Sequence, residues 1–325
     1  MSGMAVDPLR LAVAGNLLLL GEYAVLEEGG LGVGVAVERR VRFRAVPSDR
    51  FLVEGVWPGG GMRWTGPQDG NPVITETVAG ASTWAERSGI PADLPGVALQ
   101  IDSTELFDAN GRKAGFGSSA AVTVGLTCQL LDLLTGRAGR APAESGALVS
   151  LALESHRRAQ GGVGSGYDVL SSCHGGVGAF RGGRRPAWEP CGIGSLLDLA
   201  LFRGKAPVST ANSVRRYLEW KRRDPTAALE LLEQSNAAVS RFLASSTTAM
   251  ALRWFSAARE IGATLGDRIG VSARIEAPPG VDPARCKAVG AGNELGVYVF
   301  EPGSDIPAGT GMEPLRVAIR GLQRE

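Results

Sequence analysis

The sequence contains few lysines, histidines and cysteines, and each scarcity argues against a class of site. Only four of its 34 basic residues are lysines, so a site that usually employs lysine would need arginine or backbone amides instead. The four cysteines lie far apart and form no CxxC pair, which argues against a zinc knuckle and a disulfide framework. We expect isolated thiols in a reducing cytoplasm.

The chain also lacks a strong net charge and a long hydrophobic run. A net charge of +1 gives no extended basic surface for nucleic acid or an anionic membrane, so we expect neither as a partner. The longest apolar stretch, residues 11–26, is interrupted by Asn16, Gly21 and Glu22 and lacks the layout of a signal peptide. We therefore expect a cytoplasmic protein.

Strand and helix patterns alternate over the first 190 residues. Residues 9–15 and 17–20 are short apolar runs, which predict two strands that pair around Asn16. The other predictions for this half are a strand over residues 30–47 with Arg40, Arg42 and Arg44 facing solvent, a loop over residues 56–72, a helix over residues 72–89, a strand over residues 96–104, and a helix after residue 142 that stops at Gly161 and Gly162.

Long helical runs dominate residues 210–268. Strand-like segments return at residues 273–278 and 296–302, so these helices should pack on a small sheet, as in α+β domains. A chain of 325 residues is long enough for two domains. We therefore predict an α+β fold whose second domain begins near residue 200.

The stretch GFGSSAAVTVG, residues 115–125, places glycines and serines before a helical pattern. Ala121, Val124, Cys128 and Leu131 recur at spacings of three and four, which predicts a helix to about Leu134. The unpaired N–H groups at a helix N-terminus favour a phosphate, although many ordinary helices also begin with a serine cap. The chain has no GxxxxGK[ST] motif, and no strand runs directly into the first glycine as a dinucleotide fingerprint requires.

A second group of polar residues surrounds a glycine-rich turn at residues 161–166. Glu154 lies on the polar face of the preceding helix, and Asp168 should open a short helix that ends at the HGG sequence. Two carboxylates near one turn suit Mg²⁺ and a hydroxyl nucleophile, while the alternatives are a helix cap for Asp168 and simple exposure for Glu154. Nothing in the sequence orders His156 or His174 against a serine, which argues against a Ser-His-Asp hydrolase.

Five stretches, in this order along the chain, carry a family resemblance: AGNLLLLGEYAVLEEGG, KAGFGSSAAVTVG, AQGGVGSGYDV, STA at residues 209–211, and KAVGAGNELGVYVF. Together they resemble the small-molecule kinases of the GHMP superfamily, and the first and third are most similar to phosphomevalonate kinases. The resemblance implies a two-domain α+β fold. Residues 1–200 would form a nucleotide-binding domain of the ribosomal-protein-S5-domain-2-like type, and residues 201–325 a ferredoxin-like domain.

The resemblance also implies ligands and residue roles. ATP and Mg²⁺ would be the cofactors, phosphomevalonate the small-molecule substrate, and the assembly a monomer or homodimer. The nucleotide phosphate loop would comprise Lys113, Gly115, Gly117, Ser118, Ser119 and Ala120, with Ser119 and Glu154 near Mg²⁺ and with Asp168 and Ser118 as catalytic residues. The substrate would contact Asn16, Glu22, Tyr23, Ser165, Gly166, Ser209 and Thr210.

The chain departs from the family pattern at three places. Relatives usually carry lysine at the positions of Asn16 and Gly162, and the last motif keeps only Gly290 and Gly292 of a glycine loop. Two alternatives therefore stay open, namely a mevalonate kinase or another small-molecule kinase of this superfamily, and a relative that binds a nucleotide or metabolite without turnover. The arginines that could replace the missing lysines are Arg157, Arg158 and Arg215.

Overall fold

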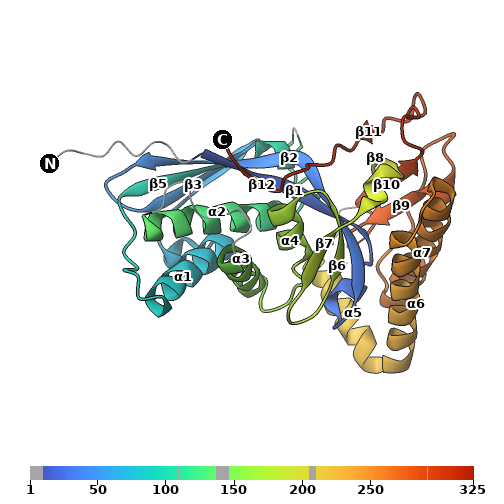
Figure 1. Cartoon of the computed structure of the whole chain (residues 1–325), viewed down its shortest axis with the longest axis horizontal. Helices are drawn as coiled ribbons and strands as arrows, with labels where there is room; N and C mark the ends of the chain where they lie inside the picture. The colour runs from blue at the N-terminus through green and yellow to red at the C-terminus, as the bar shows by residue number, and fades with distance from the viewer. Residues whose placement is uncertain (1–9, 109, 137–145, 205–209, 291) are drawn as a thin grey trace. The chain divides into compact units, whose positions relative to one another are not determined.

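The computed structural model describes residues 10–108, 110–136, 146–204, 210–290 and 292–325, which form an α+β fold as predicted (Figure 1). The helices are α1 (Pro72–Arg87), α2 (Ser118–Thr135), α3 (Gly146–Ala159), α4 (Tyr167–His174), α5 (Thr210–Arg223), α6 (Pro225–Leu243) and α7 (Thr248–Ile269). The strands are β1 (Arg10–Leu20), β2 (Leu31–Pro47), β3 (Leu52–Trp57), β4 (Gly60–Trp64), β5 (Val97–Asp102), β6 (Val177–Arg181), β7 (Ala187–Pro190), β8 (Asp198–Arg203), β9 (Cys286–Val289), β10 (Leu295–Phe300), β11 (Glu313–Pro314) and β12 (Leu322–Arg324).

The chain forms two compact units that are interleaved along the sequence. The first unit comprises residues 1–16, 36–176 and 318–325, and the second comprises residues 17–35 and 177–317. The divisions near the N-terminus fall inside β1 and inside β2. The domain boundary at residue 200 stays a prediction.

The first unit is a twisted sheet with helices on one face. Its strands follow the order β12-β1-β2-β5-β3-β4, in which β3 runs parallel to β5 while β12 with β1, β2 with β5 and β3 with β4 are antiparallel pairs. Helix α2 lies beneath the sheet, with α1 and α3 beyond it (Figure 1). Gly125 of α2 lies so close to the Phe43 ring of β2 that an added Cβ would come within 2.2 Å of it. This close approach explains why a glycine occurs in the middle of a core helix.

Helix α2 is the one helix in the described part of the chain that is long and apolar enough to cross a membrane. However, 72% of its apolar window is buried inside the protein, as expected for a core helix. Its burial follows from the apolar face predicted from Ala121, Val124, Cys128 and Leu131.

Three expectations for the first half of the chain are wrong. Residues 10–20 form one continuous strand because the Asn16 backbone N–H still finds a partner, the Phe116 carbonyl oxygen at 3.0 Å. Residues 60–64 form β4, which closes a hairpin with β3 in place of the predicted loop. Arg40 is only 5% exposed, because its guanidinium donates to the carbonyl oxygens of Arg320 and Gly321 in the C-terminal segment.

The second unit contains a four-stranded antiparallel sheet in the order β11-β8-β10-β9, together with α5, α6 and α7. The three long helices and β10 confirm the predictions for this half. Residues 273–278, however, contain no strand, although the sequence predicted one. The second unit also contains β6, which pairs with residues 31–35 of β2 and with β7.

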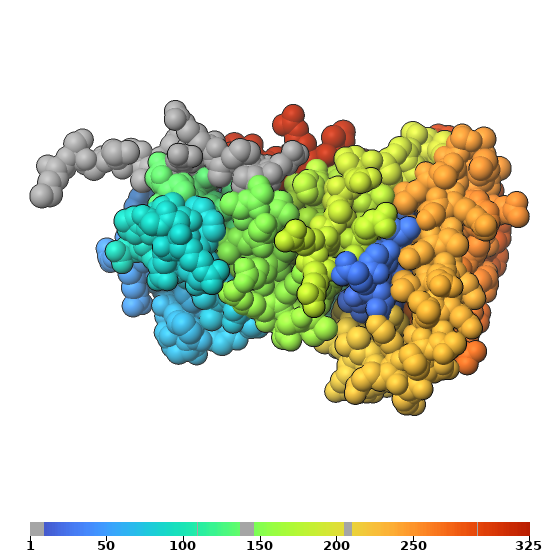
Figure 2. Space-filling view, turned by 60° about the horizontal axis from the view of Figure 1, so that its bottom comes forward, coloured from blue at the N-terminus to red at the C-terminus, as the bar shows by residue number. Residues whose placement is uncertain are grey.

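The turn after β1 is fastened to the helices of the second unit. Figure 2 shows this blue segment lying against the gold helices. Glu27 accepts a hydrogen bond from the Tyr217 hydroxyl at 2.8 Å and pairs with Lys221. The Asn236 side chain of α6 accepts from Leu31 N–H and donates to the Gly29 carbonyl oxygen. These contacts hold the segment that carries Glu22 and Tyr23.

Candidate functional site

The N-terminus of α2 is open and carries no capping side chain. Gly117 occupies the N-cap position with a φ of +61°, in the left-handed region that favours glycine. Because a glycine cap has no side-chain acceptor, it leaves the first N–H groups of α2 available, and the first turn contains no acidic residue. Gly115 also has a positive φ, of +84°, and Ser118 and Ser119 form the half-buried first turn. This helix N-terminus, which we call the helix mouth, fits an anion.

Asn16 forms the floor of the helix mouth. Its side chain is 1% exposed, and a Cβ added to Gly117 would lie 2.2 Å from Asn16 Nδ2. Asn16 Nδ2 donates to Ser172 Oγ at 3.0 Å, and the Ser172 hydroxyl donates to the Ala14 carbonyl oxygen at 2.8 Å. The Asn16 amide is thus held by the protein itself, while direct contact of Asn16 with a substrate stays a prediction.

His156 joins the helix mouth to Asp168. His156 Nε2 lies 3.2 Å from Ser119 Oγ, and His156 Nδ1 lies 3.6 Å from Asp168 Oδ2. Asp168 is half-buried at the start of α4, where its Oδ1 accepts a hydrogen bond from Val169 N–H at 2.9 Å. The sequence placed Asp168 correctly at the start of a short helix. It gave no sign that His156 would be ordered against a serine, because 37 residues separate the two.

Glu154 does not join this group. It pairs with Arg158 one helical turn further along α3, and its side chain is 54% exposed. Residues two apart on a helix point in very different directions, so the contact of His156 with Ser119 turns Glu154 away from Ser119. The structure therefore does not bring Ser119 and Glu154 together, although the sequence predicted that both lie near one cation.

The glycine-rich turn before Asp168 is clamped by Arg157. Its guanidinium donates to the carbonyl oxygens of Gly164 at 3.1 Å and Ser165 at 3.0 Å. Ser165 is 8% exposed, and Gly166 caps α4 with a φ of +87°. Arg157 is thus engaged with the turn itself, and Arg158 and Arg215 also have side-chain partners, Glu154 for the former and Asn212 for the latter.

The remaining predicted residues are Lys113, Ala120, Ser209 and Thr210. Lys113 is exposed and forms an isolated bridge with Phe107. Ala120 is buried in the first turn of α2. Thr210 is the exposed first residue of α5, while Ser209 lies outside the described residues.

The second unit contains a buried ion pair that the sequence did not reveal. The Lys287 ammonium is 2% exposed, pairs with the Glu22 carboxylate and donates to the Ala288 carbonyl oxygen at 2.9 Å. Burial raises the pKa of Glu22, and the Lys287 charge opposes this effect. Tyr23 has a φ of +62°, which is strained for a bulky residue, and burial raises its pKa to about 12.

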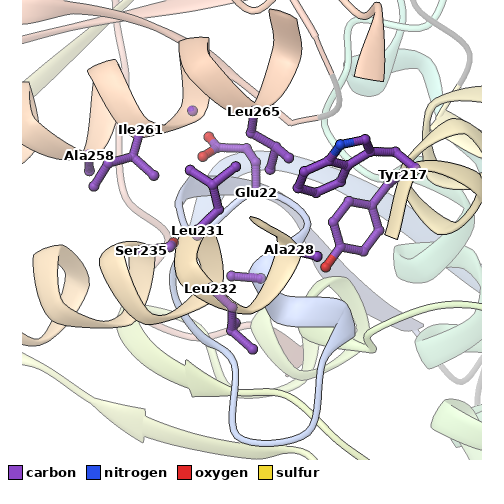
Figure 3. Close-up of a pocket in the computed structure, with 13 residues that line it drawn as sticks. Glu22, Tyr217, Ala228, Leu231, Leu232, Ser235, Ala258, Ile261 and Leu265 are labelled. Carbon is purple, nitrogen blue, oxygen red and sulfur yellow. The ribbon is translucent and has the colours of Figure 1, made fainter. Parts of the chain in front are cut away.

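Glu22 lies in the wall of two neighbouring pockets of the second unit. The first, of about 420 Å³, is lined mainly by apolar side chains of α6 and α7 and by Tyr217 and Trp220 (Figure 3). The second, of about 290 Å³, is lined in part by Lys287, Arg259 and the two glycines kept from the last motif, Gly290 and Gly292. Glu22 borders both pockets and Tyr23 borders the second, while contact of either residue with a substrate stays a prediction.

Comparison with known families decides what this architecture is. Residues 78–176, which contain the helix mouth, His156 and Asp168, match the GHMP kinases N-terminal domain. Over these residues the chain is similar to the N-terminal domain of GHMP kinases.

Similar proteins agree with this assignment. A curated phosphomevalonate kinase of Saccharolobus solfataricus is 25% identical to this chain over 236 residues, which are 70% of this chain and 68% of that protein. Three solved structures share the fold over almost the whole chain. They are Lin0012 of Listeria innocua (22% identity, TM-score 0.77, covering 98% of this chain and 99% of that one), the phosphomevalonate kinase of Streptococcus pneumoniae in complex with phosphomevalonate and AMPPNP (16%, 0.72, 97% and 99%), and the mevalonate kinase of L. major in complex with R-mevalonate (16%, 0.67, 97% and 98%).

The donor set at the helix mouth fits a nucleotide phosphate. The glycine-bordered helix mouth offers backbone N–H groups and hydroxyls with no acid in the first turn. Among the described residues, no group of three or more His, Cys, Asp or Glu side chains could hold a metal ion by itself. Mg²⁺ on a nucleotide takes most of its ligands from phosphate oxygens and water, so one or two protein oxygens suffice. Of the residues that are linked through His156, Ser119 and Asp168 carry suitable oxygens.

Proposed function

We propose that this protein is a GHMP kinase that transfers the γ-phosphoryl group of ATP to the phosphate of phosphomevalonate, giving 5-diphosphomevalonate and ADP. The observation that carries the proposal is the contact series from Ser119 at the helix mouth through His156 to Asp168. It connects a phosphate-binding helix end with a carboxylate at the start of the next helix, as transfer between two phosphate-bearing molecules requires.

In the proposed reaction, an oxygen of the acceptor phosphate forms a bond to the γ-phosphorus of ATP. The bond from that phosphorus to the oxygen bridging it to the β-phosphate breaks, and ADP leaves with the electron pair. Because a phosphate dianion is already a competent nucleophile near neutral pH, no strong base has to remove a proton from it. Asp168 then orients the acceptor and balances nearby positive charge.

The residues around the helix mouth have proposed roles that follow from their positions. The N–H groups of Ser118, Ser119 and Ala120 bind the transferred phosphoryl group and its neighbour, and the Ser118 hydroxyl adds a further donor. Mg²⁺, held with the nucleotide by Ser119, would neutralise negative charge on the phosphates. Gly115 and Gly117 allow the phosphates to approach the backbone closely.

Two observations support a phosphorylated acceptor. The curated relative with 25% identity is named a phosphomevalonate kinase. In addition, the Arg157 guanidinium lies within hydrogen-bond distance of the Ser165 carbonyl oxygen, two residues before the helix that carries Asp168. A cation at this turn favours an anionic ligand beside Ser165 and Gly166.

The proposal is tested by following ADP release from Mg²⁺-ATP with (R)-5-phosphomevalonate and with mevalonate in parallel, with and without excess EDTA. We expect ADP only with phosphomevalonate and loss of ADP formation when EDTA removes Mg²⁺. Turnover with mevalonate instead would assign a mevalonate kinase. If neither acceptor yields ADP while ATP still raises the melting temperature, the protein is a relative that binds a nucleotide without turnover.

A further inference from the structure

His156 is a buried polar side chain whose two ring nitrogens face two different parts of the site. It is 2% exposed and lies on α3 between the first turn of α2 and the first turn of α4. Nε2 faces Ser119 Oγ at 3.2 Å, and Nδ1 faces Asp168 Oδ2 at 3.6 Å. Both ring nitrogens therefore face a polar side chain, and these side chains belong to the two helix starts of the proposed site.

The partners of His156 assign its tautomer. Nδ1 faces a carboxylate oxygen of Asp168 at 3.6 Å, and this arrangement favours the tautomer with the proton on Nδ1. The Gln160 side-chain nitrogen, an amide donor, lies 3.3 Å from His156 Nε2. Both observations leave Nε2 unprotonated and able to accept a hydrogen bond from the Ser119 hydroxyl.

This tautomer determines which way the Ser119 hydroxyl points. When the hydroxyl proton is directed at His156 Nε2, the oxygen lone pairs are left for a cation or a polar group at the helix mouth. In the opposite tautomer, His156 would donate to Ser119 and occupy a lone pair. At the other nitrogen, the contact to Nδ1 fixes the second oxygen of Asp168, since the first already accepts from Val169 N–H.

We propose that His156 is a positioning residue that couples the phosphate-binding and acceptor-orienting halves of the site. It holds the Ser119 oxygen ready for the nucleotide-bound cation and holds the Asp168 carboxylate toward the acceptor. The inference rests on the proposed function, but it concerns a residue to which that function gives no role. His156 acts through Ser119 and Asp168 and is not itself in contact with the reacting atoms.

Two substitutions separate the halves of this role, because each retains one polar position of the imidazole. His156→Gln places an amide near the position of Nε2, and His156→Asn places one near the position of Nδ1. We expect His156→Gln to keep the KM for Mg²⁺-ATP within about threefold of wild type while kcat falls about 10- to 100-fold. We expect His156→Asn to raise the KM for Mg²⁺-ATP by about tenfold or more. The matched control, His174→Gln, changes the other histidine of the chain and should leave both constants unchanged.

A measurement without turnover keeps the inference separate from the proposed function. The chain has only two histidines, so ¹⁵N-histidine labelling gives few signals, and the His174→Gln variant assigns them. We expect His156 in the intact protein to show a protonated Nδ1 and an unprotonated Nε2, and Asp168→Asn to reduce this preference. An Nε2-protonated tautomer, or a tautomer unaffected by Asp168→Asn, would overturn the inference even if the enzyme is active. Equal loss of kcat with unchanged KM in both His156 variants would also overturn it.

If the wild-type protein forms no ADP with any acceptor, the proposed function fails while the tautomer measurement still decides the inference. In that case the dissociation constant for Mg²⁺-ATP replaces the KM. His156→Asn should weaken binding by about tenfold and His156→Gln should leave it within about threefold of wild type. Equal weakening in both variants would contradict the proposed separation of roles.

Discussion

Asn16 Nδ2 donates a hydrogen bond to Ser172 Oγ at 3.0 Å, and this contact joins the middle of β1 to α4 beneath the helix mouth. The Ser172 hydroxyl in turn donates a hydrogen bond to the Ala14 carbonyl oxygen. Both side chains are almost fully buried, so the short series of hydrogen bonds lies in a region of low dielectric, where a missing partner is costly.

Ser172→Ala should therefore destabilise the protein by about 1–3 kcal/mol, because Asn16 Nδ2 would lose its buried acceptor. The neighbouring Ser171 is a matched control, since it is equally buried but its Oγ has no hydrogen-bond partner among the described residues. Ser171→Ala should be neutral or slightly stabilising, because alanine also favours the helix. Urea unfolding of both variants checks this, and equal losses of stability would contradict the contact.

Gly117→Ala should be among the most damaging single-methyl changes at the helix mouth. The added Cβ would lie 2.2 Å from Asn16 Nδ2, in addition to the cost of a positive φ. Gly136 closes the same helix with a φ of +62° and has nothing within 4 Å of an added Cβ. Gly136→Ala should therefore lose only the backbone contribution, about 1 kcal/mol.

Thermal unfolding with and without Mg²⁺-ATP measures this difference between the two glycines. Gly117→Ala should be less stable than Gly136→Ala and should lose most of the stabilisation that Mg²⁺-ATP gives to wild type. A Gly117→Ala protein that ATP still stabilises as it does wild type would contradict a phosphate site at this end of α2.

The elements around the site could be predicted from local patterns in the sequence. The spacing of Ala121, Val124, Cys128 and Leu131 predicted α2, and the glycines before Asp168 predicted the turn and α4. The continuity of β1 through Asn16 could not be predicted, because it depends on the Phe116 carbonyl oxygen, a hundred residues away. The alternation of apolar residues and arginines in β2 predicted that Arg40 faces solvent, because the sequence does not show that the C-terminal segment covers it.

Arg157→Lys should affect the substrate that binds beside the glycine-rich turn. Arginine donates to two carbonyl oxygens at once, Gly164 and Ser165, and a lysine ammonium cannot reproduce this planar fork. We expect the KM for the acceptor to rise about tenfold while the KM for ATP stays within about threefold of wild type. The adjacent Arg158→Lys is the control, because its exposed pair with Glu154 contributes little. Steady-state kinetics with each substrate varied in turn measures both KM values. Equal changes in the two variants would contradict a specific role of Arg157 at the turn.

Lys287→Met should destabilise the protein by about 3–5 kcal/mol at neutral pH, because it leaves the Glu22 carboxylate buried without its cation. Lys221→Met, which removes a cation from a more exposed pair with Glu27, should cost less than about 1 kcal/mol. Glu22→Gln in the Lys287→Met background should restore much of the loss, since it removes the unpaired charge.

The same variant should show a defined pH dependence. Burial raises the pKa of Glu22 above its ordinary value of 4.5, so the folded state keeps a proton that the unfolded state has released. The free energy of unfolding therefore falls as pH rises above 4.5, and it should fall further in Lys287→Met, where no cation opposes the shift. Unfolding measured across this range should show the difference from wild type growing with pH. A difference that is constant or shrinks as pH rises would contradict a stabilising ion pair between Glu22 and Lys287.

Side-chain contacts between distant segments explain why the site itself was only partly predicted. Glu154 precedes the glycine-rich turn and Asp168 follows it, so the sequence predicted that the two lie together. However, His156 points toward Ser119, and Glu154, two residues earlier on the same helix, points toward solvent. The pairs His156 with Ser119 and Lys287 with Glu22 join residues 37 and 265 positions apart, and no local pattern marks either pair.

The most direct test of the account is the rate of ADP release from Mg²⁺-ATP and phosphomevalonate in wild type, Asp168→Asn and Glu154→Gln. Asp168 faces His156 at the centre of the proposed site, whereas Glu154 pairs with Arg158 in solvent. The account predicts turnover by wild type, a loss of about 100-fold or more in Asp168→Asn, and a rate within about threefold of wild type in Glu154→Gln. Turnover that survives Asp168→Asn but is lost in Glu154→Gln would contradict it.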